Sequence, residues 1–280
     1  MKKKYDDIIA QHYQEIARDH GFSSTSTMAD KITRKLETEA ILQFVDESIR
    51  IQRTENKPRQ FILMDVGCGN GYTLEILLKA FPNLIFYGIE KSDELRSLAT
   101  TRFSEAKNIT ILEGDVRDNQ FAQGLEVDIL ICQRVLINLL DFDDQRIALE
   151  NIINSVRSPG DFSQRGGKLL FLESFQDTLE RLNEARSEFE LPPISSAYHN
   201  LYLPNNFFDR DDLNWLNTEG RFTPSNFLST HYYITRVLHP ILKKGKEFKR
   251  NSEFVKFFSQ ALLPYSGDYS PIKLNIFEKI

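Results

Sequence analysis

Residues 61–78 constrain the fold more than any other stretch of this chain. An apolar run at 61–64 leads into an acid and three glycines at alternate positions: Asp65, Gly67, Gly69 and Gly71. A run of this length predicts a buried parallel strand, and glycines allow the turn after it to pass close to a ligand. Leucines at 74, 77 and 78 then predict a helix, whose first N–H groups are free. The stretch therefore predicts a cradle for a nucleotide-type ligand at the end of a first strand.

The next three apolar runs each end in polar residues. The run at 84–89 ends at Glu90 and Lys91, the run at 109–112 is followed by Asp115 and Val116, and the run at 128–132 by Gln133 and Arg134. An acid about 20 residues beyond a glycine turn can accept both hydroxyls of a ribose. These strand-end features, with helical segments between them, favour a doubly wound α/β domain.

The G-x-G-x-G spacing led by Asp65, together with Glu90 and Asp115, resembles the motifs of class I S-adenosylmethionine (SAM) dependent methyltransferases over residues 61–175. The dinucleotide-binding spacing is G-x-G-x-x-G, so a NAD-type oxidoreductase is disfavoured. The resemblance implies a seven-stranded sheet in the order 3-2-1-4-5-7-6 with strand 7 antiparallel. It also implies that residues 59–280 form a Rossmann-like SAM-binding methyltransferase domain and that residues 1–58 form an N-terminal helical cap.

The resemblance implies residue roles toward the cofactor SAM. Glu90 would take the ribose hydroxyls, Asp115 the adenine amino group, and the backbone of Val116 the ring edge. In the cap, Arg34 would pair with the SAM carboxylate, unless it pairs with Glu37 on the helix surface. Tyr13 would stack on or hydrogen-bond the ligand, unless it only packs in the core. The expected cofactor-binding residues are Asp65, Gly67, Gly69, Gly71, Glu90, Lys91, Asp115, Val116, Gln133, Tyr13 and Arg34.

The remaining elements are expected in the C-terminal half. Residues 168–174 predict the fifth strand, and the β-rich stretch 226–238 and residues 272–278 predict a final hairpin. Residues 211–216 predict a helix before that hairpin, and residues 247–263 predict another before the last strand. Residues 176–210 exceed a normal connection, which predicts a substrate insert.

The insert holds the densest polar and aromatic cluster in the chain, Tyr198, His199, Asn200 and Tyr202. An alcohol that attacks a sulfonium methyl must lose its proton, and a histidine suits that task at neutral pH. We therefore expect His199 to be the general base, with His231 as the alternate; a packing role for His199 stays open. The expected substrate-contacting residues are Arg134, Tyr198, Asn200 and Tyr202.

Residues 132–135 read Cys-Gln-Arg-Val. In the family that the chain resembles, the enzymes that methylate planar amino groups carry Asn/Asp-Pro-Pro-aromatic at this place. This departure disfavours methylation of a nucleic-acid base or of glutamine. The insert resembles small-molecule and glycan O-methyltransferases of bacterial type. We therefore expect methylation of a hydroxyl on a small molecule or glycan. N-methylation of a small amine and a catalytically silent SAM-binding subunit are the alternatives.

Composition limits the partners. The chain has 280 residues, enough for one α/β domain with additions. Its net charge of -5 argues against an electrostatic nucleic-acid binder. No apolar stretch reaches the roughly 18 residues of a membrane span, and the two cysteines show no metal-ligand spacing. We expect a cytoplasmic monomer or homodimer with no nucleic-acid partner, no membrane span and no metal.

Overall fold

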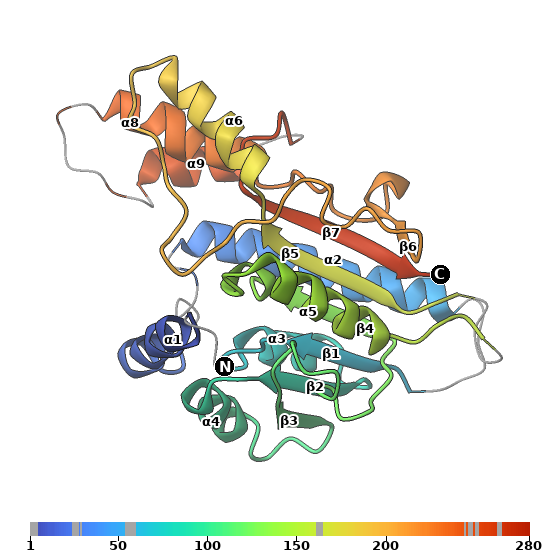
Figure 1. The fold of residues 1–280 in the computed structure, drawn as a ribbon. Coiled ribbons are helices and arrows are strands. Elements are labelled where there is room, and N and C mark those ends of the chain that lie inside the picture. The colour runs from blue at the N-terminus through green and yellow to red at the C-terminus, as the bar shows by residue number, and fades with distance from the viewer. Residues whose placement is uncertain are drawn as a thin grey trace.

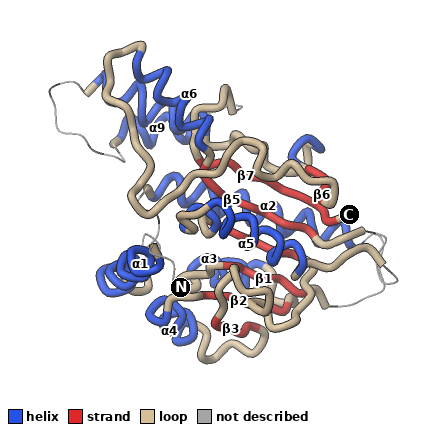
Figure 2. Tube along the Cα trace, in the orientation of Figure 1, coloured by secondary structure: helices blue, strands red, loops and turns tan. Residues whose placement is uncertain are grey.

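The computed structural model describes residues 5–23, 28, 30–53, 60–160, 165–243, 245, 249, 252–261 and 265–280. Within these residues a seven-stranded sheet runs in the order β3-β2-β1-β4-β5-β7-β6 (Figures 1 and 2). The strands are β1 Ile62–Val66, β2 Ile85–Glu90, β3 Ile109–Glu113, β4 Ile129–Gln133, β5 Lys168–Ser174, β6 Leu213–Trp215 and β7 Ile272–Lys279. Strand β7 is antiparallel to both β5 and β6. The predicted strand order and the antiparallel seventh strand are confirmed.

Helices cover both faces of the sheet, with α2 and α3 on one face and α5 on the other. The helices of the described residues are α1 Asp6–His20, α2 Lys31–Arg53, α3 Tyr72–Ala80, α4 Asp93–Arg102, α5 Phe142–Asn154, α6 Gln176–Ser187, α7 Ser229–Tyr233, α8 His239–Leu242 and α9 Glu253–Ala261, with a π-helical turn Ile234–Leu238 between α7 and α8. Short 3-10 turns form at Leu136–Asn138 and Asn217–Glu219. None of the helices in the described part of the chain has the length and apolar character needed to cross a bilayer.

Alternation along the central strands explains the two-sided core. In β4, Ile129 and Ile131 pack on one face with α2 and α3, while Leu130 and Cys132 pack on the other with α5. Side chains in a strand point alternately to opposite faces, so a strand covered on both sides reads as a continuous apolar run. This is why the apolar runs of the sequence located β1, β2, β4 and β5 correctly; β3 was also located by its apolar run, although it is a partly exposed edge strand.

Two C-terminal predictions are wrong. Residues 226–238, expected as a strand, contain α7 and the π-helical turn, so His231 lies in a helix. Residues 211–216, expected as a helix, supply β6 at Leu213–Trp215. The aromatic and β-branched composition of 226–238 misled the prediction because tertiary packing overrides β-propensity. There Thr235 Oγ1 donates to the carbonyl of His231 at 2.8 Å, one helical turn back.

Two other predictions are altered. The helix expected at 247–263 runs from Glu253 to Ala261, and residues 247, 248, 250, 251 and 262–264 lie outside the described residues. The expected insert 176–210 begins with α6, and only its later part is irregular. The division of the chain at residue 58 stays a prediction. Helix α2 contributes Ile41, Phe44 and Val45, each at most 1% exposed, to the sheet core.

Candidate active site

The glycine turn joins β1 to α3. Gly67, Gly69 and Gly71 all have positive φ, at 69°, 57° and 79°. A Cβ at Gly67 would lie 2.4 Å from Val135 Cγ2, and one at Gly71 would lie 2.6 Å from the Phe103 ring, so these two glycines permit close packing. A Cβ at Gly69 would meet nothing within 4 Å. Gly69 therefore presents bare backbone to the open side of the turn.

Glu90 holds the same turn from the end of β2. Its Oε2 accepts the N–H of Gly69 at 2.8 Å, and its Oε1 accepts the N–H of Ser92 at 2.8 Å. Glu90 is 9% exposed, and burial raises the pKa of its carboxyl despite these bonds. Each oxygen keeps a lone pair beyond the one used, so the carboxylate can accept two more hydrogen bonds.

Arg34 and Asp65 place opposite charges beside the turn. Arg34 is 8% exposed and donates to Gln133 Oε1 and Thr73 Oγ1, both at 3.2 Å. Its Nε is buried and has no hydrogen-bond partner within the described residues. Burial raises the pKa of Asp65 to about 7, against the opposing effect of Arg34. A buried guanidinium with an unused N–H is a ready partner for a carboxylate. The alternative, a surface pair of Arg34 with Glu37, does not form, because Glu37 instead binds the residues at the end of β4.

Gln133 is the last residue of β4, and Arg134 directly follows it. Glu37 is fully buried and accepts from Gln133 Nε2 at 2.9 Å and from Arg134 Nη1 at 2.6 Å. Arg134 has φ 55°, the left-handed region that non-glycine residues rarely adopt. Burial opposes the charge of Arg134, but Glu37, together with Tyr13 and Tyr232, offsets this and raises its pKa. The strand end is thus fixed by an acid from α2.

The carboxylate of Asp115 is surrounded by hydrogen-bond donors from Arg117 and Lys91. Arg117 donates to it from the backbone N at 3.1 Å, from Nε at 3.0 Å and from Nη2 at 2.6 Å, and Lys91 Nζ lies 2.9 Å from Oδ2. Burial alone would raise the pKa of Asp115, but the bonds from Arg117 and Lys91 hold it well below its ordinary value. Val116 is buried beside it, and its carbonyl accepts from Asn151 at 2.8 Å.

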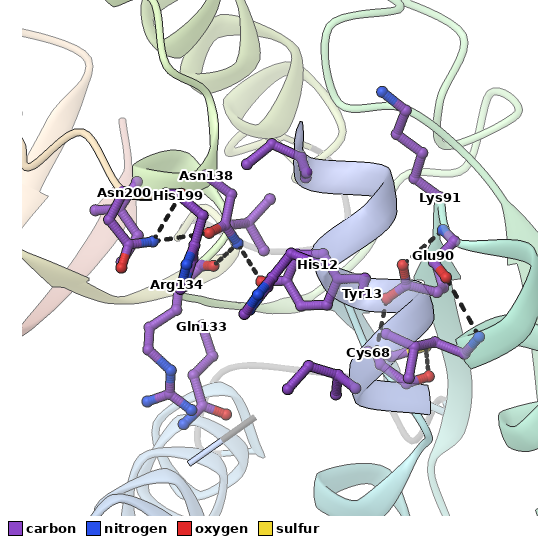
Figure 3. A pocket seen from close by; sticks show the side chains of 18 of the residues that line it. His12, Tyr13, Cys68, Glu90, Lys91, Gln133, Arg134, Asn138, His199 and Asn200 are labelled. Carbon is purple, nitrogen blue, oxygen red and sulfur yellow. Dashed lines mark hydrogen bonds between the residues drawn. The ribbon is translucent and has the colours of Figure 1, made fainter. Parts of the chain in front are cut away.

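A cavity of about 690 Å³ joins these groups to the insert (Figure 3). Of the predicted site residues, its walls include Tyr13, Arg34, Asp65, Gly67, Gly69, Glu90, Lys91, Asp115, Val116, Gln133, Arg134, His199, Asn200 and Tyr202. Gly71, Tyr198 and His231 are not among its lining residues. Tyr198 is 70% exposed, and His231 is buried with Nε2 3.7 Å from Asp30. The described residues contain no cluster of three or more His, Cys, Asp or Glu that would hold a metal ion.

The far end of the cavity is walled by α1 and the insert. The rings of His199 and His12 stack with centroids 3.7 Å apart, and His12 Nδ1 lies 3.2 Å from the hydroxyl of Tyr198. Burial and the neighbouring His12 lower the pKa of His199 to about 4, so its imidazole is neutral at pH 7. Asn138 donates to the hydroxyl of Tyr13 at 2.6 Å and accepts from Asn200 at 2.9 Å (Figure 3).

Comparison with known proteins agrees with this geometry. Residues 63–160, which span β1 to α5 with the glycine turn and the acids, match the family model described as "Methyltransferase domain". The chain is a class I SAM-dependent methyltransferase. Over 277 residues it is 22% identical to the malonyl-[acyl-carrier protein] O-methyltransferase of Halalkalibacterium halodurans, and the match covers 97% of this chain and 90% of that one.

Two solved methyltransferases share the fold along nearly the whole chain. Magnesium protoporphyrin IX methyltransferase from Synechocystis PCC 6803, solved with bound SAM, is similar with a TM-score of 0.54 and 11% identity, covering 98% of this chain and 96% of that one. The plantazolicin methyltransferase, solved with a pentazolic desmethyl analogue and S-adenosylhomocysteine (SAH), gives a TM-score of 0.51 and 15% identity, covering 100% and 99%. At these identities the likeness shows a common fold.

In this methyltransferase α1 covers the cavity, lying beside α4 (Figure 1). The segment after α1 is bound to the glycine turn itself, because Asn70 Nδ2 donates to the carbonyls of Gly21 at 2.8 Å and Ser23 at 3.1 Å. Arg102 donates to the carbonyl of Phe22 at 2.8 Å. Asn70, a residue inside the motif, therefore anchors the covering helix.

Sequence reasoning missed several residues of this site. They are His12, Glu37, Asn70, Arg117 and Asn138, which act through contacts that are remote in sequence. His12 directly precedes Tyr13 on α1, which was a usable signal once Tyr13 was expected to face the ligand. No pattern in the sequence around Asn138 distinguishes it from an ordinary turn residue.

Proposed function

We propose that this methyltransferase transfers the methyl group of SAM to an oxygen atom of a small-molecule or glycan acceptor. The observation that supports this is one continuous cavity, which joins the glycine turn and Glu90 to a wall of neutral hydrogen-bonding side chains. That wall includes Tyr13, Asn138, His199 and Asn200. A neutral wall that offers both donors and acceptors suits a polar oxygen acceptor.

The cofactor end fits SAM. The unused Nε of buried Arg34 suits the amino-acid carboxylate, and Asp65 suits the ammonium group. Glu90 has acceptor capacity for the ribose hydroxyls, and Gly69 leaves the turn open for close approach. Asp115 and Val116 are proposed for the adenine. When bound, SAM supplies a methyl group already activated on sulfur. The chain's own residues then contribute alignment and exclusion of water under α1.

His199 is proposed to take the proton of a hydroxyl acceptor. Its lowered pKa keeps the imidazole neutral and able to accept a hydrogen bond at pH 7. A hydroxyl becomes strongly acidic as its oxygen bonds carbon, so a weak base can take the proton late in the reaction. The stacked His12 holds the ring of His199 in place.

A carboxylate acceptor is a second candidate, favoured by Arg134. Its guanidinium lies on the cavity wall and spends one N–H on Glu37, and its backbone is held in a rare conformation. The relative from H. halodurans is named for a malonyl substrate, and a malonyl group carries a free carboxylate. A carboxylate needs no base, because it is deprotonated at neutral pH.

Methyl-labelled SAM and a panel of alcohols, sugars, carboxylic acids and amines test these proposals, with product identified by mass spectrometry. Transfer to a hydroxyl that falls about 100-fold in His199→Ala supports the base assignment. His20→Ala, also on the cavity wall, is the matched control and is expected to keep its rate. If carboxylic acids are the accepted class and His199→Ala keeps its rate, the acceptor is a carboxylate bound by Arg134 and His199 is not a base. Transfer to amines alone, or SAM binding without turnover, would reject O-methylation.

A further inference from the structure

Arg117 joins the covering helix to the adenine end of the site. Its Nη2 lies 2.9 Å from Asp6 Oδ1 on α1 and 2.6 Å from Asp115 Oδ2 after β3. Its Nη1 donates to the hydroxyl of Tyr5 at 3.2 Å and lies 3.4 Å from Asp144 Oδ2 on α5. The hydroxyl of Tyr5 also donates to Asp144. One guanidinium, 17% exposed, therefore contacts segments from three separate parts of the chain.

The charges around Arg117 make it hard to replace. It contacts three carboxylates, those of Asp6, Asp115 and Asp144, whereas Lys91 contacts two, with Nζ 3.3 Å from Asp6 and 2.9 Å from Asp115. Loss of the guanidinium would leave the three carboxylates facing one another with less compensation. Their repulsion would push the start of α1 away from β3 and α5.

Asp115 also has little spare capacity. A carboxylate offers about four lone-pair positions, and Arg117 directs three donor nitrogens at Asp115 while Lys91 directs another. The Lys91 side chain is 53% exposed, whereas that of Arg117 is 17% exposed. Lys91 is therefore the group that can leave to admit a new donor, while Arg117 keeps the carboxylate oriented.

We infer that Arg117 is a positioning residue for the cofactor: it orients Asp115 toward the adenine amino group and at the same time ties α1 closed over the bound molecule. The inference rests on the proposed placement of adenine at Asp115. Adenine recognition and closure of α1 are then one event, since the same side chain supports both.

The test compares SAH with S-inosylhomocysteine, which has an oxygen in place of the adenine amino group. Dissociation rates and affinities are measured by stopped flow and calorimetry, with thermal melting of each free variant as the folding control. The native protein is expected to prefer SAH at least 10-fold. Arg117→Met is expected to release SAH at least 10-fold faster and to retain less than a 3-fold preference.

Three further variants separate the two roles. Asp6→Asn is expected to speed release while the preference for SAH is kept, because the ion pairs of Asp6 with Arg117 and Lys91 are lost while the contacts of Arg117 with Asp115 remain. Arg117→Lys is expected to restore part of the slow release without restoring the preference, since an ammonium lacks the planar fork. Arg157→Met is the matched control, because Arg157 also pairs with a buried acid, Asp128, at 3.0 Å, away from α1 and the cavity.

Native release and preference in Arg117→Met would overturn the inference. So would faster release with the preference fully kept, because Asp115 would then not be oriented by Arg117. If the native protein itself does not distinguish the two ligands, the placement of adenine at Asp115 is wrong and the inference falls with it. If Arg117→Met does not fold, Asp6→Asn and Arg117→Lys decide the same question.

Discussion

Replacing Glu90 by glutamine separates cofactor binding from support of the glycine turn. In the native protein the carboxylate accepts the N–H groups of Gly69 and Ser92, one on each oxygen. A glutamine amide can accept on its oxygen only, so its NH₂ group must face one of those two N–H groups. One buried donor is then left unsatisfied, which costs ~1–3 kcal/mol of unfolding free energy.

The loss of cofactor affinity should be larger than a neutral hydrogen bond would suggest. Charge-assisted bonds to the ribose hydroxyls would be lost or reversed, and we expect SAH to bind ~1.5–3 kcal/mol more weakly, which is about 10- to 150-fold. Calorimetry with SAH and denaturant unfolding of the free protein measure the two effects separately. Glu113→Gln is the matched control, because Glu113 pairs with Glu90 in register on β3 but its side chain is 73% exposed. Native SAH affinity in Glu90→Gln would refute the assignment of Glu90 to the ribose.

Two further predictions concern the same turn. Burial raises the pKa of Asp65 to about 7, so between its ordinary pKa and pH 7 the folded chain keeps a proton that the unfolded chain has lost. The stability that this proton contributes is therefore lost as the pH rises across that range to the folded pKa of about 7. The ammonium group of SAH favours the ionised carboxylate, so the affinity for SAH should rise about 10-fold per pH unit up to pH 7 and then level off. Calorimetry from pH 5.5 to 8.5 should show no such rise in Asp65→Asn. An equally steep rise in that variant would show that Asp65 is not the cause. Gly71→Ala should lose at least ~2 kcal/mol of unfolding free energy, because it combines a left-handed φ of 79° with a Cβ 2.6 Å from Phe103. Gly124→Ala has a similar φ of 76° with nothing within 4 Å, so it isolates the backbone cost, and equal losses in the two variants would show that the contact with Phe103 does not matter.

The elements that were predicted correctly from the sequence are those whose residue pattern can be recognised within a short stretch of the chain. Strands β1, β2, β4 and β5 are largely buried on both sides, so they read as apolar runs, and edge strand β3 is apolar although its side chains are only partly buried. The ends of β1 to β4 carry or precede the polar residues of the site. Strand β6 is only three residues long and exists because it pairs with the edge of β7. A segment that short has no periodicity to detect. The helical path of 229–242 depends likewise on packing that propensity does not contain.

The grouping of the strand-end residues around the glycine turn was predictable from the sequence, and the contacts that α1 makes with the site were not. Motif residues such as Glu90 act on the turn through the neighbouring strand end, and their spacing along the chain is fixed by the βαβ geometry. Asn138 instead meets Tyr13 across 125 positions of sequence, and Arg117 meets Asp6 across 111. Those pairings follow from where α1 comes to rest, which no spacing rule encodes.

The two N-terminal helices, α1 and α2, differ in the contacts that fix them to the rest of the protein. This difference indicates which of them is easier to displace when a ligand enters the cavity. Helix α2 buries Ile41, Phe44 and Val45 in the sheet core and fixes the end of β4 through Glu37. Among residues 6–20 of α1, all of them described, Ala17 is the one that is buried, and the other contacts of α1 include ion pairs and hydrogen bonds at its rim. Burial of a large apolar side chain is worth ~1.5–3 kcal/mol, whereas a partly exposed ion pair is worth about 1 kcal/mol or less. We therefore expect the cavity to open by movement of α1, with the segment after α1 still held to the glycine turn by Asn70.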